Sequence, residues 1–211
     1  KIASKNKPYF LATGAASMED IDRAVNLALK INKDLLLMQC NTNYTGSLEN
    51  FKFINLKVLN LFKKKYPNLL LGLSDHTPGH STVLGAVALG ACAIEKHFTD
   101  DNNRNGPDHP FSMNPKSWKE MVQRTRELEK SLGEEKKKVE DNEKETVILQ
   151  RRAVRASHDL NADHTITEKD LIMLRPCPKE AISPYEFKKV LNKKLKNDIK
   201  NGDIIKWSDL D

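Results

Sequence analysis

Residues 68–98 read NLLLGLSDHTPGHSTVLGAVALGACAIEKHF, and this stretch decides the fold. Two short apolar runs, 68–76 and 92–98, flank an almost wholly apolar segment of helical length at 80–91. Strands that are covered on both faces are continuous in apolar character, and a helix that connects two of them makes them parallel. The stretch therefore predicts a strand, a helix and a second strand of one parallel sheet.

The same alternation continues on both sides of this stretch. The expected strands cover residues 8–14, 34–40, 68–76 and 92–98. Ser17 and Asp20 have the spacing of a capping box, so we expect a helix to begin after Ser17. Further helices are expected over 47–67, 80–91 and from Asn114 to 132, the last with Pro115 in its first turn. Strands that alternate with helices in this way predict a parallel sheet covered by helices.

Two architectures fit such a chain, an open doubly wound sheet and part of a (β/α) barrel. No glycine-rich dinucleotide motif follows any expected strand, which disfavours the open sheet. Polar residues instead follow the strand ends, at Thr13, 41–44, 74–76 and 95–97. In a barrel the carboxyl ends of all strands surround one pocket, so these residues would converge. The sequence therefore predicts an α/β fold with about four βα units of a barrel.

Beyond residue 132 the character of the sequence changes. Residues 133–147 are highly charged, and we expect a linker or an exposed helical arm there. Residues 159–171 and 198–210 then align at a constant offset, with aspartate matching aspartate and apolar residues matching apolar residues. Each copy is expected to give a turn, a short strand and a capped helical turn. This repeat predicts a small, β-rich, pseudo-symmetric module.

Composition limits the classes of partner. The formal net charge is +6, but lysines lie beside glutamates, which is typical of solvated faces rather than of a nucleic-acid-binding surface. A positive balance still favours small anionic substrates such as phosphates. No apolar run approaches the roughly 18 residues of a membrane helix, and the first residues do not resemble a signal peptide. We therefore expect a cytoplasmic protein with no nucleic-acid and no membrane partner. Because the chain does not begin with Met, we also expect a piece of a longer protein or a processed product.

Two histidines are the main candidates for chemistry. His76 and His97 each end an expected strand beside a carboxylate, Asp75 or Glu95. Neutral imidazoles bind divalent cations, and carboxylates or water can complete the shell. The plainer alternative is a hydrogen-bonded structural histidine in each place. Since both face one pocket in a barrel, the pair favours a metal site.

Three further features have both a functional and a plain interpretation. Ser74 and the loop 77–79 precede a helix and could bind a phosphate, or they could merely cap that helix. Lys96 could neutralise an anion or point between strand and helix. The loop 106–112, with Asp108, could contact a substrate or could simply be a turn.

Several motifs resemble those of the sialic acid synthase family. They read LATG, MQCNTNY, GLSDHTPG, VALGACAIEKHFTDD, GPDHPFSMNP and RPCPKEAISP, and together they span almost the whole chain. The resemblance implies that residues 1–132 are the C-terminal half of a (β/α)8 TIM barrel. It also implies a linker at 133–147 and a small β-rich antifreeze-like (SAF) domain at 148–211.

The resemblance also implies an activity and a cofactor. Family members condense phosphoenolpyruvate with an N-acetylated aldose, such as N-acetylmannosamine, to give a nonulosonic acid and phosphate. His76 and His97 fall on the ligands of a divalent metal, with Mn²⁺ first and Mg²⁺ or Co²⁺ as alternatives, and we add Glu95 to them as a catalytic residue. Family members are domain-swapped homodimers, in which Arg175 enters the active site of the partner subunit.

The same resemblance assigns the substrate contacts. Ser74 falls on a phosphoenolpyruvate contact, and Asp108 falls on a residue that binds the acceptor sugar. Tyr44 falls on a tyrosine of the sugar pocket, and Asn41 and Thr42 occupy polar positions of the same segment.

This sequence departs from the family in ways that leave alternatives open. Ala12 stands where relatives often have serine, which removes a possible phosphate hydroxyl, and the segment NTNYTGS lacks the proline common after the tyrosine. The first four βα units of the family, with their substrate-binding lysines and catalytic glutamate, have no counterpart in this sequence. One alternative is a related synthase for legionaminic acid, pseudaminic acid or a spore-coat or capsule sugar. The other is a non-catalytic binding or assembly piece, and we expect this piece alone to be inactive.

Overall fold

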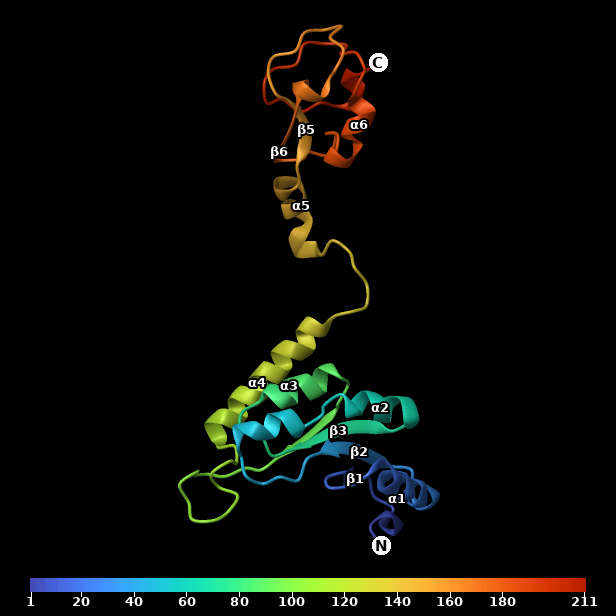
Figure 1. Cartoon of the computed structure of the whole chain (residues 1–211), viewed down its shortest axis with the longest axis vertical. Helices are drawn as coiled ribbons and strands as arrows, with labels where there is room; N and C mark the ends of the chain where they lie inside the picture. Colours follow the sequence, from blue (N-terminus) through green and yellow to red (C-terminus); the bar gives the residue numbers. More distant parts are fainter. The chain divides into compact units, whose positions relative to one another are not determined.

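The computed structural model describes all residues 1–211 and divides into two compact units, Lys1–Glu134 and Glu135–Asp211. Figure 1 colours the first unit from blue to yellow-green and the second from ochre to red. Each unit has its own hydrophobic core. None of the helices is both long enough and apolar enough to cross a membrane.

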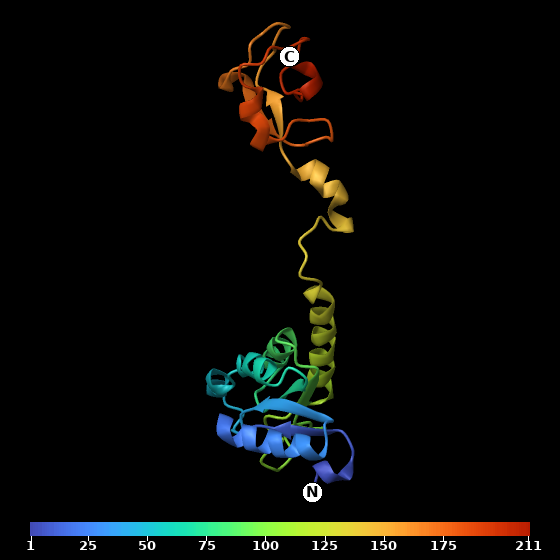
Figure 2. The ribbon, with the colours of Figure 1, turned by 90° about the vertical axis from the view of Figure 1, so that its right-hand side faces the viewer.

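The first unit is built on a four-stranded parallel sheet with its strands in chain order. The strands are β1 (Tyr9–Ala12), β2 (Leu35–Cys40), β3 (Leu70–Asp75) and β4 (Ala93–Lys96). The helices that follow them are α1 (Met18–Ile31), α2 (Val58–Lys65), α3 (Ser81–Ala88) and α4 (Pro115–Leu132). Parallel strands in chain order with a helix after each are the topology of a (β/α)8 barrel. The unit is therefore the predicted half-barrel (Figures 1 and 2).

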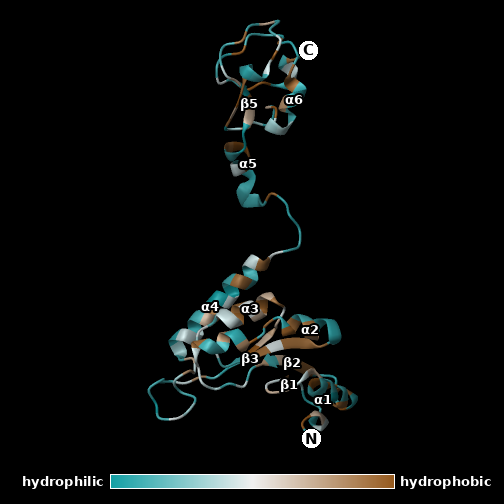
Figure 3. Ribbon diagram, viewed as in Figure 1, coloured by the Kyte–Doolittle hydropathy of each residue, from teal (hydrophilic) through white to brown (hydrophobic).

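One face of the sheet is covered by the helices and forms the core. Leu37 of β2 is fully buried on this face, and so is Phe62 of α2. Figure 3 shows β2 and β3 in the brown of hydrophobic residues. Side chains alternate across a strand, so Leu36 lies on the opposite face. There a Cβ at Gly72 would come within 2.8 Å of both the Leu36 side chain and the Ala93 carbonyl oxygen. Residue 72 must therefore be glycine, because the Leu36 side chain and the β4 backbone leave no room for a Cβ there.

The predicted start signals of two helices are confirmed. Ser17 accepts a hydrogen bond from the backbone N–H of Asp20 at the start of α1, and Asp20 accepts one in return. Asn114 caps α4 in the same reciprocal manner with Ser117, and Pro115 is the first helical residue. These caps satisfy backbone donors that the helices cannot satisfy themselves.

The helix predicted within 47–67 is confirmed only in the second part of that segment, where α2 (Val58–Lys65) ends just before Pro67. The chain forms a short 3-10 helix, Leu48–Phe53, before α2 begins. Asn55, which lies between them, has a left-handed backbone with φ of 49°. The buried side chain of Gln39 donates to the carbonyl of Ile54 at 2.9 Å. Hydrogen bonds from polar side chains therefore replace the helical ladder at this point.

The predicted linker contains both of the forms that the sequence left open. Residues 133–140 have no helix or strand, and a 3-10 turn, Asp141–Glu143, leads into α5 (Lys144–Gln150). The expected domain boundary at residue 148 falls inside α5.

The second unit is small and rich in short strands. It contains β5 (Ala153–Ala156) paired antiparallel with β6 (Leu171–Leu174), and the short helix α6 (Phe187–Val190). Leu160 and Ile199, which match in the sequence repeat, exchange two backbone hydrogen bonds of 2.8 Å each. The two copies therefore face each other.

The aspartates that open the two copies make equivalent contacts. Asp159 accepts the backbone N–H of Asn201 at 2.8 Å, and Asp198 accepts that of Ala162 at 2.8 Å. Asn201 and Ala162 are themselves matching positions of the repeat. This exchange confirms the predicted pseudo-symmetric module.

Asp170, in the first copy of the repeat, is a buried carboxylate with two histidines beside it. Its Oδ2 accepts from the Thr167 N–H at 2.7 Å and lies 3.0 Å from His164 Nε2, and His158 Nε2 lies 3.4 Å from Oδ1. Burial opposes the ionisation of Asp170, but the hydrogen bonds outweigh burial and lower its pKa from 3.8 to about 2.

Asp170 should make the second unit sensitive to acid. Because its pKa is lower in the folded state, the stabilisation is present above pH 3.8 and is lost as the pH falls towards 2. We expect Asp170→Asn to lower the free energy of unfolding by about 2 kcal/mol at neutral pH and to flatten this acid dependence. Trp207 fluorescence in a Trp118→Phe background measures unfolding of this unit. Equal acid dependence in Asp170→Asn and its parent would contradict the assignment.

Candidate functional site

His76 and His97 lie side by side at one rim of the sheet, with ring centroids 5.0 Å apart. β3 and β4 pair in parallel with Ser74 opposite Glu95, so the same register places the two histidines next to each other. The rings converge as the barrel interpretation predicts, and their role as metal ligands stays a prediction.

Both imidazoles have an oxygen atom close to Nδ1, a hydrogen-bond partner for His76 and an ion-pair contact for His97. His76 Nδ1 lies 2.7 Å from the backbone carbonyl oxygen of Asn41, and His97 Nδ1 lies 3.3 Å from Asp108 Oδ2. A carbonyl oxygen only accepts, so Nδ1 of His76 carries the proton and Nε2 keeps its lone pair. The Asp108 carboxylate favours the same tautomer of His97. Metal-binding histidines are commonly oriented by such oxygen partners.

Aromatic rings cover the two histidines. The centroid of the Tyr44 ring lies 4.2 Å from the ring centroid of His76 and 5.4 Å from that of His97. The ring centroid of Phe111 lies 5.2 Å from that of His97. His76 is only 4% exposed, whereas Tyr44 is 49% exposed. The tyrosine therefore shields the imidazole of His76 from water, which strengthens electrostatic interactions beneath it.

Ser74 and Glu95 form a second polar pair at the same rim. The Ser74 hydroxyl donates to Glu95 Oε2 at 2.7 Å. Cys40 is opposite Ser74 in the sheet register, and burial raises the pKa of its thiol. Cys40 is therefore a neutral packing residue beneath the rim, while Glu95 presents an exposed carboxylate.

Asp75 and Lys96 face away from this rim, which corrects two possibilities raised by the sequence. Their side chains are 0% and 2% exposed, and Lys96 Nζ lies 2.5 Å from Asp75 Oδ2. Lys96 also donates to the carbonyl of Thr77 at 2.6 Å, and Thr82 donates to Asp75 at 2.7 Å. Lys96 therefore does not neutralise a bound anion, and Asp75 does not complete a metal shell. The reason is the alternation of side chains across a strand.

The segment after β2 contacts the histidine pair through a backbone carbonyl group. Asn41 holds His76 with its carbonyl oxygen, and its own Nδ2 makes only a long 3.4 Å hydrogen bond, to Phe53. Thr42 is exposed, and its Cγ2 would lie 2.1 Å from a Cβ at Gly14. The turn after β1 must therefore contain glycine to pass this segment.

Arg175 is not part of the histidine cluster. It belongs to the second unit, where it is exposed and its Nε donates to the carbonyl of Gln150 at 2.7 Å.

The loop after β4 provides contacts that sequence reasoning missed. A hollow of about 310 Å³ lies between this loop and His97, and it is lined by Asp108 and Ser112 among others. Ser112 donates both its backbone N–H and its hydroxyl to the carbonyl of Asp108, at 3.1 and 2.7 Å. These contacts have no periodic signal, because they follow the path of one irregular loop.

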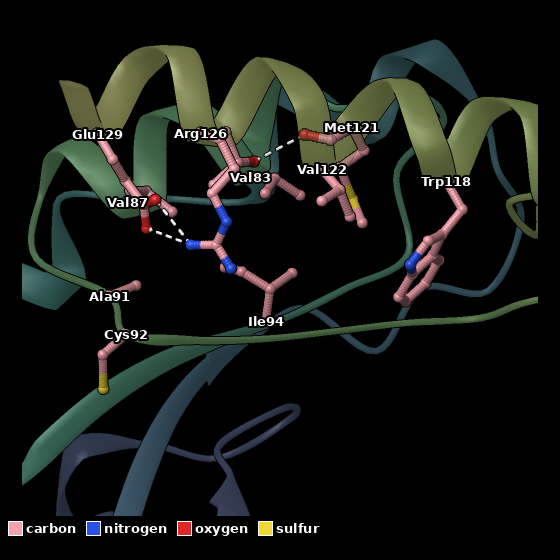
Figure 4. Close-up of a pocket in the computed structure, with 11 residues that line it drawn as sticks. Val83, Val87, Ala91, Cys92, Ile94, Trp118, Met121, Val122, Arg126 and Glu129 are labelled. Carbon is pink, nitrogen blue, oxygen red and sulfur yellow. Dashed lines mark hydrogen bonds and ion pairs between the residues drawn. The ribbon is translucent and has the colours of Figure 1, made fainter. Parts of the chain in front are cut away.

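A different hollow, of about 230 Å³, lies between α3, α4 and β4 (Figure 4). Its lining is mostly apolar, with Val83 and Trp118 among its residues, and Arg126 pairs with Glu129 at its edge. It contains none of the candidate site residues, so it is separate from the histidine site.

The histidine pair fits an open divalent-metal site. No group of three or more His, Cys, Asp or Glu side chains converges in a way that would bind a metal ion. A cation at His76 and His97 would therefore have two protein nitrogens, and oxygens of substrate or water would complete its shell. Catalytic metal sites keep such open positions, and Mn²⁺, Mg²⁺ and Co²⁺ accept oxygen ligands.

The sequence matches the NeuB family over residues 1–137 and the SAF domain over residues 151–211. The chain belongs to the NeuB family. It is 34% identical over 98% of its length to N,N'-diacetyllegionaminic acid synthase of Campylobacter jejuni, of which it covers 61%. This NeuB-family chain therefore spans only part of the length of that relative.

Two solved structures are similar to this NeuB-family chain. N-acetylneuraminic acid synthetase of Leptospira borgpetersenii is 32% identical with a TM-score of 0.61, over 69% of this chain and 50% of that one. A spore coat polysaccharide biosynthesis protein of Bacillus subtilis is 26% identical with a TM-score of 0.57, over 99% of this chain and 62% of that one. The predicted family, the half-barrel and the SAF domain are thereby confirmed.

The buried pair of Asp75 and Lys96 should be essential for stability. Removing one partner leaves an uncompensated buried charge, so we expect Lys96→Met to lower the free energy of unfolding by about 3–5 kcal/mol. The double variant Asp75→Asn/Lys96→Met should recover part of that loss. Denaturant unfolding of the first unit measures both.

A matched control is the exposed pair of Lys52 and Glu49, for which Lys52→Met should cost less than about 1 kcal/mol. If Lys96→Met costs no more than Lys52→Met, the buried pair does not have the importance assigned to it.

Proposed function

We propose that this chain is the cation-facing part of an enzyme that condenses phosphoenolpyruvate with an N-acetylated aldose, giving a nonulosonic acid and phosphate. The observation that carries the proposal is the pair of imidazoles 5.0 Å apart, each oriented through Nδ1 so that Nε2 is free. The names of its relatives support the same class of reaction. Since the chain covers 61% of the C. jejuni relative, the proposal concerns the complete enzyme.

The proposed reaction forms one carbon–carbon bond and breaks one carbon–oxygen bond. The enol carbon of phosphoenolpyruvate attacks the aldehyde carbon of the open-chain sugar, which leaves positive charge on the second carbon of phosphoenolpyruvate. Water adds at that second carbon, and the tetrahedral intermediate loses phosphate by C–O cleavage. One proton of the water ends on the former aldehyde oxygen, and the other leaves with the phosphate.

The residues at the rim have separate proposed roles. His76 and His97 would bind a divalent cation, Mn²⁺ first, through Nε2, and when bound the cation supplies Lewis-acid polarisation of a carbonyl group. Tyr44 keeps water away from the imidazoles. Glu95 can accept a proton through Ser74, whose hydroxyl already donates to it. To donate to a phosphate oxygen, the Ser74 hydroxyl would have to turn away from Glu95.

The sugar contacts are proposed around the hollow beside His97. Asp108 lines this hollow and its side chain is 54% exposed, so the oxygen that does not face His97 can accept from a sugar hydroxyl. Asn41 and Thr42 are proposed contacts on the segment after β2, which also carries Tyr44.

Arg175 supports a proposed domain-swapped homodimer. Its guanidinium is exposed, and only its Nε is engaged within the chain. The remaining donors could therefore orient the N-acyl end of a sugar in the active site of the partner subunit.

The proposed reaction can be tested in a chimera. The part of the C. jejuni relative that precedes the match is fused to this chain, and phosphate release is measured with phosphoenolpyruvate and a panel of N-acetylated and diacetamido aldoses. We expect turnover with Mn²⁺ and at least one aldose, with a product mass that shows addition of three carbons. His97→Ala should lower kcat about 100-fold or more, equivalent to about 3 kcal/mol.

The matched control is His158→Ala, because His158 belongs to the second unit and has no proposed role in the reaction. Its turnover should equal that of the parent chimera. A folded chimera that turns over no aldose, or one that His97→Ala does not impair, would contradict the proposed function.

A further inference from the structure

The loop after β4 leaves the histidine site and returns to it. Thr99 N–H donates to the carbonyl of Met113 at 2.8 Å, and Met113 N–H donates to the carbonyl of His97 at 2.9 Å. Both ends of the loop, residues 99–113, are thereby anchored beside His97. The loop carries Asp108, the carboxylate that orients this imidazole.

Asn102 is the centre of the hydrogen bonds inside the loop. Its Nδ2 donates to the carbonyls of His109 and Ser112, both at 2.8 Å. Its Oδ1 accepts from Nδ2 of Asn114 at 2.8 Å, and Asn114 is the residue that caps α4. Asn102 therefore uses both donors and its acceptor to tie the loop to the start of a helix.

Asn102 reaches Asp108 through its neighbours. It bonds to the carbonyl of His109, which follows Asp108, and to that of Ser112. Ser112 in turn donates its N–H and its hydroxyl to the carbonyl of Asp108. One amide side chain therefore holds the backbone that follows Asp108, and through Ser112 it also holds the carbonyl of Asp108 itself.

We propose that Asn102 is a positioning residue that sets the Asp108 carboxylate against Nδ1 of His97 and so keeps Nε2 of His97 free for a cation. That Nε2 of His97 is kept free for a cation rests on the proposed function. That Asn102 positions Asp108 rests only on the hydrogen bonds of the loop. His76 provides an internal comparison, because its Nδ1 is held by the backbone of Asn41 and not by the loop.

The tautomer of His97 tests the proposal in the full chain without any ligand. Long-range ¹H–¹⁵N spectra of the imidazoles are recorded near pH 8.5, about two units above the ordinary imidazole pKa of about 6.5, and assigned by single histidine substitutions. In the parent, both His76 and His97 should carry the proton on Nδ1. In Asn102→Ala, His97 should become a mixture of tautomers, while His76 should stay unchanged.

Two further variants keep the result interpretable. Asn102→Asp keeps the size of the side chain but cannot donate to the two carbonyls, so it should act like Asn102→Ala. Asn103→Ala removes a side chain of the same loop that donates only to Asp101, and it should leave both histidines unchanged. An unchanged His97 in Asn102→Ala overturns the proposal. So does loss of the His76 signal in both Asn102 variants, since Asn102 would then hold the fold rather than Asp108.

Titration with Mn²⁺ separates this inference from the proposed function. Loss of a residue that orients a ligand typically weakens metal binding 10- to 100-fold, so we expect a weakening of about tenfold in Asn102→Ala. If the parent chain binds no Mn²⁺ while the tautomer of His97 relaxes as expected, the proposed function fails and the positioning by Asn102 stands. If the tautomer relaxes and Mn²⁺ affinity is unchanged, the inference that Asn102 serves the cation site is overturned.

Discussion

Asp75 and Lys96 form an ion pair on the helix-facing side of β3 and β4, with N–O distance 2.5 Å and almost no exposure to solvent. Such a pair is stable in the interior only when further hydrogen bonds satisfy both charges, and Thr77 and Thr82 provide them. Because side chains alternate along a strand, burying this pair beneath the helices turns the residues on either side of it to the opposite face. His76 and His97 therefore share one rim.

The two histidines at that rim are held in physically different ways. His76 is buried and oriented by a backbone carbonyl, whereas His97 is oriented by Asp108, a carboxylate on a loop. A backbone carbonyl next to a strand moves little, but a loop carboxylate depends on the hydrogen bonds of its neighbours. One proposed ligand position is thus set by the sheet and the other by the loop that also lines the proposed sugar hollow. Substrate binding in that hollow would therefore act directly on one of the two proposed cation ligands.

Much of the half-barrel could be predicted because apolar continuity and capping residues are local signals. Ser17 and Asn114 start helices where their spacing indicates, and the strand ends place the histidines together. The interruption of the helix near Asn55 could not be predicted, because it depends on a hydrogen bond from Gln39, which lies in β2. The direction of the Lys96 side chain follows from the same alternation that places its neighbour His97 at the rim, since this alternation turns Lys96 beneath the helices. The Asn102 network was missed, because nothing periodic marks it.

The central claim is that one cation is bound by Nε2 of His76 and Nε2 of His97 together. Crystals of the chain grown with Mn²⁺, with anomalous scattering measured on both sides of the manganese edge, test this claim most directly. The account predicts one strong anomalous peak about 2.2 Å from both Nε2 atoms, with the Nδ1 atoms still facing Asn41 and Asp108. A peak that contacts only one of the two rings, or that lies at another part of the chain, would contradict it.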